Sequence, residues 1–354
     1  LVALLTVFVT MPHHTYNSRR VPITFSKFGN VAVFCSMMTC GIYVLVYGKT
    51  LDWFADPTIV RSTILTIVFA AVFVYMEMSR RSPYFIMEVF RLRTINVGII
   101  LFLLLMVFNT SSMFVSMFTG VGMSVDNWQN ASLGNWSIAG YFTGAVIAIA
   151  LGSKNVKLKY LFAIGFLLIG ASSIFMYFEV QTAGLYERMK YPVIIRSAGM
   201  MLVYSLAAVY ANQRMPYKYL STWICIMLSV RMVVGPGIGS ALYSNVMQHR
   251  QQHYVTMLAQ DFDRTDTQTA ADYDRTAYGM RMQGSSGTDA ENVAAMSVKG
   301  KVHVQATLSA IKEMSGWTFY GCMISMLFVL IYPYRKRNLS AWHDSNPNRS
   351  LKRR

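Results

Sequence analysis

The chain has 354 residues, of which 54% are hydrophobic and only 14% are charged, and its formal net charge is +16. So little charge excludes an ordinary water-soluble domain. A basic balance also suits nucleic-acid binding, but the Lys and Arg residues gather in short loops beside apolar segments, which is the pattern of membrane orientation. The composition therefore predicts an all-α polytopic membrane protein.

Residues 1–10 are apolar but too few to cross a bilayer, which takes roughly 20 helical residues. They lack the basic flank and the small-residue cleavage site of a signal peptide. We expect this segment to be the truncated remnant of a membrane helix from a longer protein.

Mostly apolar segments of about membrane-helix length follow it. They cover residues 29–48, 59–78, 95–117, 136–151, 160–178, 192–211, 219–245 and 315–333. The predicted fold is thus a bundle of about eight transmembrane helices. Between the last two, the polar stretch 261–292 predicts a flexible excursion, and the apolar spacing within 302–314 predicts a helix that leads into the final span.

Basic residues alternate from loop to loop along the chain. One set of alternate loops holds most of them, including Arg80, Arg93 and Lys157, while the short loops of the other set hold few. By the positive-inside rule the richer set is cytoplasmic. We therefore expect a multi-pass protein of the cytoplasmic (inner) membrane, with its C-terminus in the cytoplasm and residues 246–314 outside.

Several different short motifs follow one another along the chain in a recognisable order. They are Phe25-Ser-Lys-Phe-Gly29, Tyr47-Gly-Lys-Thr-Leu-Asp-Trp-Phe54, Phe90-Arg-Leu-Arg-Thr-Ile-Asn-Val-Gly98, Tyr191-Pro-Val-Ile-Ile-Arg-Ser-Ala-Gly199 and Gly235-Pro-Gly-Ile-Gly-Ser-Ala241. Their order, over nearly the whole chain, resembles the fourteen-helix drug:proton antiporters of the major facilitator superfamily (the EmrB/QacA type) from the end of the sixth helix onward.

This resemblance implies a domain organisation. The domains would be a helix remnant at 1–10, a central helix pair with cytoplasmic loops at 11–93, a C-terminal six-helix transporter bundle at 94–333 that includes the external loop 246–314, and a basic cytoplasmic tail at 334–354.

The resemblance also implies a function. It is proton-coupled secondary active transport of the multidrug efflux type, in which amphipathic or cationic small molecules are exported by alternating access. The implied partners are the substrate and protons, the lipid bilayer, the missing N-terminal six-helix bundle and a periplasmic adaptor protein, with no nucleic acid. The alternative is a transport-incompetent membrane scaffold or a gene fragment.

Four residues are candidates for the translocation pathway. Arg196 and Arg231 lie well inside apolar segments, where a charge costs roughly 2.5 to 3.5 kcal/mol on insertion scales and seeks the bundle interior or a wet cavity. Asn109 belongs to a polar interruption of its helix, and Met113 offers a soft surface for apolar substrates. The alternatives are snorkelling for the arginines and interhelical packing for the other two.

A glycine-rich run is the candidate for helix packing or gating: Gly235, Pro236, Gly237 and Gly239. Proline removes a backbone donor and kinks a helix, while glycine lets a neighbouring helix approach closely. In transporters with repeated halves, a flexing helix of this kind helps to open or seal the path. The alternative is an ordinary, tightly packed and kinked helix.

No enzyme is predicted, because the chain has no complete phosphate-binding motif Gly-x-x-x-x-Gly-Lys-Ser/Thr, no His-Glu-x-x-His and no Gly-x-Ser-x-Gly motif. We also expect no cofactor and no metal, since His249 and His253 share a helical spacing without a visible third ligand. Glu77 and Glu179 are placed at helix ends, so this portion is expected to contain no proton carrier.

Overall fold

The computed structural model describes residues 25–79, 85–154, 156–181, 184–212, 219–261, 267–284 and 286–332. Helices form the regular structure of these residues, and no strand occurs among them. The expected helix remnant at 1–10 and the basic tail at 334–354 lie outside the described residues.

The helices run nearly end to end along the described chain. The α-helices are α2 (Phe25–Tyr47), α3 (Pro57–Met78), α4 (Arg93–Thr110), α5 (Met113–Met117), α6 (Asn127–Leu133), α7 (Trp136–Ser153), α8 (Leu158–Glu179), α9 (Lys190–Asn212), α10 (Leu220–Ser229), α11 (Gly235–Asp261), α12 (Thr267–Met282) and α13 (Gly287–Ile331). Shorter helical segments include η1 (Trp53–Ala55), η2 (Met87–Arg91), η4 (Tyr186–Met189) and two π-helices, η3 (Phe118–Gly122) and η6 (Val230–Val234).

Within the described residues, 8 helical stretches are long and apolar enough to cross a membrane. Each corresponds to one of the predicted apolar segments, with differences at the ends. The prediction of an all-α polytopic membrane protein is therefore confirmed.

The polar interruption near Asn109 is a break in the third span. α4 ends at Thr110, and the chain resumes as α5 at Met113 before it passes into η3. The hydroxyl groups of Thr110 and Ser111 donate to the carbonyl oxygens of Met106 and Phe108 at 3.1 and 2.7 Å. Such local bonds compete with the regular helical ladder, which explains where the helix stops.

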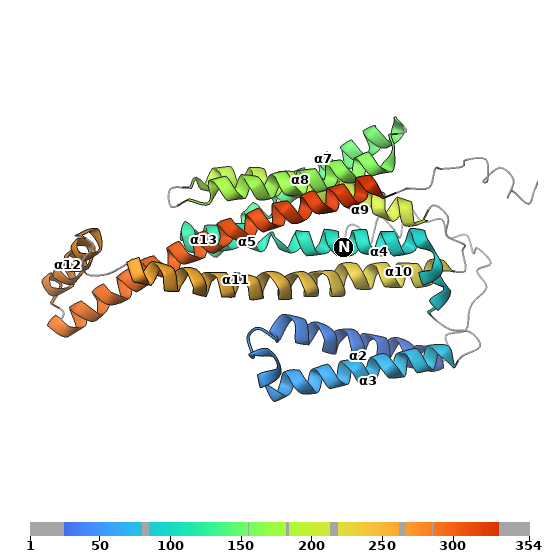
Figure 1. Ribbon diagram of the computed structural model, residues 1–354, viewed down its shortest axis with the longest axis horizontal. Helices are drawn as coiled ribbons and strands as arrows, with labels where there is room; N and C mark the ends of the chain where they lie inside the picture. The colour runs from blue at the N-terminus through green and yellow to red at the C-terminus, as the bar shows by residue number, and fades with distance from the viewer. Residues whose placement is uncertain are drawn as a thin grey trace, which may run out of the picture.

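The long helices lie side by side with their axes roughly parallel, and the α2–α3 hairpin lies along one side of the bundle, next to α11 (Figure 1). The main apolar core is formed by α4, α8, α9 and α10. Its largest fully buried side chains include Phe102, Phe162, Phe166 and Trp223. These aromatic side chains determine the distances between the helices that carry the polar residues.

The α7 and α9 helices approach each other through small residues. A Cβ added at Gly140 would lie 2.6 Å from the Cβ of Ser197, and one added at Gly144 would lie 3.0 Å from the Cα of Ala198. The spacing Gly-x-x-x-Gly therefore brings the two backbones into contact, as is common between helices in lipid.

The prediction of a flexible excursion at 261–292 is wrong for most of that stretch. Residues 267–282 form α12, and α13 already begins at Gly287, where the Ser286 hydroxyl caps the helix by accepting from the backbone N–H of Asp289 at 3.2 Å. The composition misled because large aliphatic residues are scarce there. The two helices pack instead through alanines, of which Ala290 and Ala294 are fully buried.

Two ion pairs add to the contact between α12 and α13. Arg281 pairs with Glu291 at 2.8 Å, and Lys301 pairs with Asp272 at 2.6 Å. The hydrogen bond from the Lys301 ammonium, together with its charge, lowers the pKa of the Asp272 carboxyl below its ordinary value. Both pairs are exposed, so they orient the helices more than they stabilise them.

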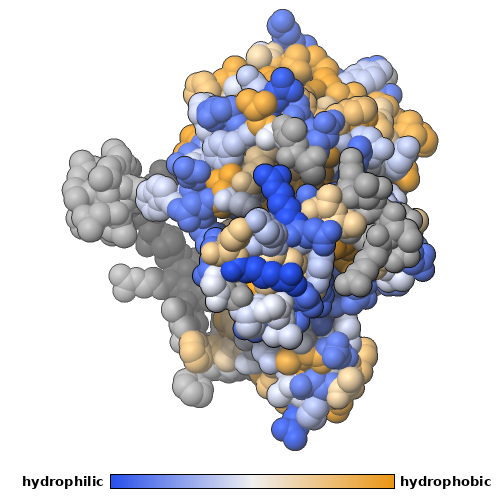
Figure 2. Space-filling view, turned by 90° about the vertical axis from the view of Figure 1, so that its left-hand side faces the viewer, coloured by the Kyte–Doolittle hydropathy of each residue, from blue (hydrophilic) through white to orange (hydrophobic). Residues whose placement is uncertain are grey.

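The predicted helix at 302–314 is present, but it is continuous with the last span. α13 has 45 residues, which corresponds to about 68 Å at about 1.5 Å per residue, while the bilayer core measures about 30 Å. Together with α11 and α12 it projects from one end of the bundle (Figure 1). Hydrophilic side chains gather over the centre of that end, with apolar side chains around it (Figure 2).

The loops predicted to be cytoplasmic lie at the opposite end. The α7–α8 connection and the segment before α4 are both at the end of the bundle remote from α12 (Figure 1). The α2–α3 turn lies at the end nearer to α12. The alternation of loops on which the charge census depends is thus present in the fold, while the side of the membrane stays a prediction.

Cysteine-accessibility labelling tests that side. In a variant whose native cysteines are replaced, Thr288→Cys at the start of α13 is expected to react with a membrane-impermeant maleimide in intact cells. Ser153→Cys at the end of α7 is expected to react only after permeabilisation, because the basic end faces the cytoplasm. Both side chains are exposed in the fold, so burial protects neither, and the reverse pattern would overturn the orientation.

Candidate functional site

The predicted glycine-rich run lies where α10 continues into α11. The two helices are joined by the π-helix η6, and Pro236 is the second residue of α11. A proline has no N–H to donate and its ring crowds the preceding turn of an α-helix. A π segment directly before it gives that turn more room, and π segments in helices are frequent at functional sites.

The glycines of this run contact two different helices. A Cβ added at Gly235 would lie 2.5 Å from the Cβ of Met106, and one added at Gly239 would come within 3.2 Å of the Cα of Val107 and overlap the Thr110 hydroxyl. Both positions face α4. Gly237 instead faces α2, where a Cβ would lie 3.1 Å from a methyl carbon of Leu45.

The structure therefore places the predicted packing residues at a close contact. We call Gly235 and Gly239, with Met106 and Thr110 opposite them, the α4–α11 seam. Because α11 has no side chain at these two positions, Met106 and Thr110 of α4 pack directly on its backbone, and either a shift or a rotation of α11 changes this contact.

Arg231 lies at the start of the same element, within η6. Its Nη1 donates to the hydroxyl oxygen of Tyr204 at 2.5 Å, and its guanidinium carbon lies 4.4 Å from the centre of the Tyr204 ring. The ring in turn packs edge-on against Phe102 at 5.6 Å between centroids. Arg231 is thus directed toward α9, and no carboxylate of the described residues lies within ion-pair distance of it.

Arg196 is buried in the N-terminal half of α9, with 9% of its surface exposed. Its Nε has no hydrogen-bond partner among the described residues, and Tyr141 of α7 is an electrostatic neighbour. Arg196 lies apart from the α4–α11 seam.

Asn109 and Met113 flank the break in the third span. Asn109 is half-buried in the last turn of α4, directly before Thr110 of the seam. Met113 packs against a second apolar cluster that contains Phe114 and Tyr243. The structure thus brings Asn109 and Arg231 to the α4–α11 seam, places Met113 in an apolar cluster further along α11, and leaves Arg196 elsewhere.

A buried acid was not anticipated from the sequence. Glu77 lies near the end of α3, as predicted, but only 3% of it is exposed. One carboxylate oxygen accepts from the Asn30 side-chain amide at 2.8 Å and the other from the Phe85 backbone N–H at 3.1 Å. A signal was present, because Asn30 and Glu77 are polar residues at the same basic end of two consecutive spans.

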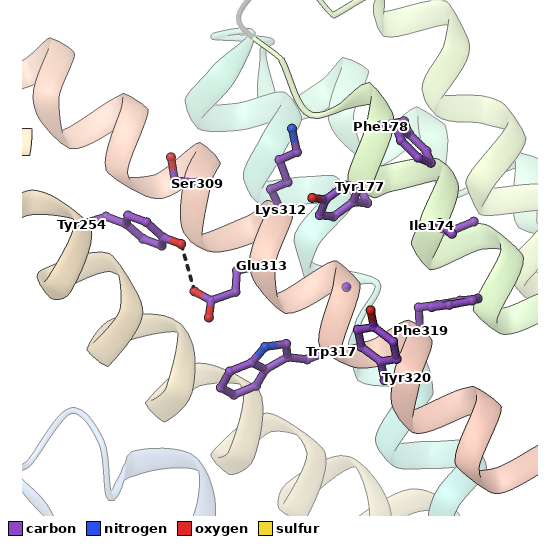
Figure 3. Close-up of a pocket in the computed structure, with 11 residues that line it drawn as sticks. Ile174, Tyr177, Phe178, Tyr254, Ser309, Lys312, Glu313, Trp317, Phe319 and Tyr320 are labelled. Atoms are coloured by element: carbon purple, nitrogen blue, oxygen red, sulfur yellow. Dashed lines mark hydrogen bonds between the residues drawn. The ribbon is translucent and has the colours of Figure 1, made fainter. Parts of the chain in front are cut away.

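A pocket of about 560 Å³ was also missed. It lies at the end of the molecule where α11 and α13 project, between the end of α8, Tyr254 of α11 and residues 309–320 of α13 (Figure 3). Its polar side chains include Lys312 and Glu313. Sequence inspection had no means of grouping residues that lie so far apart in the chain.

Metal-ligating side chains form no group of three or more within the described parts of the chain. A scan against protein-family models finds no matching family, and a search of curated proteins finds no matching relative. The likeness to drug:proton antiporters therefore rests on the quoted sequence motifs, and it enters below as part of a proposal.

Substitution of Glu77 tests the buried polar contact. Glu77→Ala removes the acceptor of two hydrogen bonds, from the buried Asn30 amide and from the Phe85 N–H, and losing a buried acceptor costs about 1–3 kcal/mol. We expect a clearly lower unfolding temperature of the purified protein in detergent. Glu77→Gln is the matched control, because its amide group can still serve both partners after rotation of the Asn30 amide; equal unfolding temperatures for Ala and Gln would contradict the prediction.

Proposed function

We propose that the chain is part of a proton-coupled secondary active transporter that exports amphipathic or cationic small molecules by alternating access. The observation that carries the proposal is Arg231, a cation deep in the membrane that is paired with a tyrosine and, among the described residues, not with an acid. The α4–α11 seam beside it supplies the means of movement. The resemblance to drug:proton antiporters supplies the direction and the energy source.

The depth of Arg231 follows from helix geometry. It lies about 17 Å beyond Leu220 along a helix that rises about 1.5 Å per residue, and the bilayer core is about 30 Å thick. Arg231 is therefore close to the middle of the membrane. Substrate and ion sites of secondary transporters lie near this level, and ionisable residues there are most often functional.

The chemistry of the pair suits a pathway residue. Stacking on Tyr204 and the hydrogen bond to its hydroxyl hold the guanidinium in place, but they do not neutralise its charge. An anionic group of a substrate, or an acid that moves into reach, gains free energy by approaching it. Exchange between such partners is one way for a transporter to link binding to a conformational change.

The seam permits that change. α4 and α11 run in parallel and touch through Gly235 and Gly239, so α11 is able to slide or rotate over α4 without the removal of large side chains. Alternating access further requires a second bundle that rocks against this one. The resemblance implies an N-terminal six-helix bundle in that role, which would also hold the proton-coupling acid. It further implies that the transporter lies in the cytoplasmic membrane and has a periplasmic adaptor protein as a partner.

The seam is tested by Gly239→Leu in the complete protein. A leucine there overlaps Thr110 and separates α11 from α4, so we expect export of a cationic dye to fall at least several-fold while membrane expression is unchanged. Gly152→Leu in α7 is the matched control, because nothing lies within 4 Å of a Cβ at that position. Normal export by Gly239→Leu would reduce the seam to ordinary packing.

The cation is tested by Arg231→Ala and Arg231→Lys, assayed for export in cells and for substrate binding in detergent. We expect Arg231→Ala to lose export, and Arg231→Lys to retain part of it, because lysine keeps the charge but not the planar stacking on Tyr204. Arg188→Ala controls for the removal of a charge at an exposed site. If the complete wild-type protein neither binds nor exports any tested compound, the alternative of a transport-incompetent scaffold replaces this proposal.

A further inference from the structure

The pocket at the projecting end of the bundle is amphipathic along its length. α13 lines the pocket between Ser309 and Tyr320, and α8 and α11 stand on either side (Figure 3). The polar residues Ser309, Lys312 and Glu313 come first along α13, and the aromatic residues Trp317, Phe319 and Tyr320 follow. Since α13 enters the membrane in this direction, the polar end lies toward the surface and the aromatic end toward the bilayer interior.

The polar end carries an unbalanced positive charge. Both oxygens of Glu313 are engaged, one by Arg250 at 3.2 Å and the other by the Tyr254 hydroxyl at 3.2 Å. The Arg250 guanidinium also lies 4.9 Å from the centre of the Trp317 ring. Lys312 lies over the Tyr177 ring at 5.0 Å, and no carboxylate of the described residues is within ion-pair distance of it.

The other end opens on a surface that belongs in lipid. Tyr320 is 66% exposed, and Ile324, one turn further along α13, is 67% exposed. Large exposed apolar side chains on a membrane span face acyl chains. Tyrosine and tryptophan at this level are typical of the headgroup region.

We propose that this pocket binds one phospholipid molecule of the surrounding leaflet, with its phosphate at Lys312 and its acyl chains along Ile174 and Tyr320. A phosphate satisfies the free ammonium by a charge-assisted hydrogen bond. The apolar wall then takes the chains, which a soluble phosphate ester lacks. The bound lipid joins α8 to α13 at the point where α13 leaves the membrane, and the inference does not depend on transport.

Native mass spectrometry of the delipidated protein, titrated with dioleoyl phosphatidylglycerol, tests the proposal. The complete protein is expected to retain one tightly held lipid. Lys312→Ala and Lys312→Met should each weaken that binding about ten-fold or more, because the charge-assisted bond is lost. Lys299→Ala, which removes the same charge from an exposed site on the same helix, should bind as the wild type does.

A second variant tests the shape of the site without touching its charge. Gly316 lines the pocket, and Gly316→Leu places a side chain there; a Cβ at this position would already lie 3.7 Å from the Tyr177 ring. It should exclude the lipid while helical content and monodispersity are unchanged. Lipid retention by Gly316→Leu at wild-type affinity would place the lipid elsewhere.

Two competitors distinguish the sources of the phosphate. Glycerol 3-phosphate and dioleoylglycerol should each fail to displace the lipid, because one lacks acyl chains and the other lacks the phosphate. Displacement by glycerol 3-phosphate would show that the pocket takes a soluble phosphate ester. Displacement by dioleoylglycerol, or equal lipid binding by the Lys312 and Lys299 variants, would show that the phosphate is not bound at Lys312.

Discussion

Backbone N–H and C=O groups find no water in the core of a bilayer, so a chain that crosses it must satisfy them within its own helices. This constraint explains why the described spans are helical throughout and why their interruptions are so informative. At Thr110 and Ser111, side-chain hydroxyls take over carbonyls of the preceding turn. At Pro236, a π segment precedes the residue that lacks a donor. Both interruptions border the α4–α11 seam.

The same absence of water governs the polar side chains. Glu77 has donors for both carboxylate oxygens, one of them from another span. Arg231 has a ring and a hydroxyl group. The Glu77 contact closes a junction between α2, α3 and the segment before α4. Arg231, by contrast, has no carboxylate within ion-pair distance among the described residues.

At the projecting end the constraint is relaxed, because water and headgroups meet the protein there. α11, α12 and α13 project there as helices. α12 and α13 pack through buried alanines and form exposed ion pairs with each other. Charged side chains stack on aromatic rings where the two solvents meet, as Arg250 does on Trp317 and Lys312 on Tyr177. An amphipathic pocket at this boundary matches the amphipathic molecules that surround it.

The sequence by itself determined the class of fold and the approximate position of each span found among the described residues, because hydropathy over a bilayer thickness is a local property. It also located the break near Asn109 and the close contact at the glycine run, which follow from backbone chemistry. Only the tertiary structure decided which helix each glycine meets, that Arg231 pairs with Tyr204, that Glu77 is buried, and that residues 267–282 form a helix. Each of these depends on contacts between residues that are distant in the chain. A local sequence pattern carries no information about such contacts.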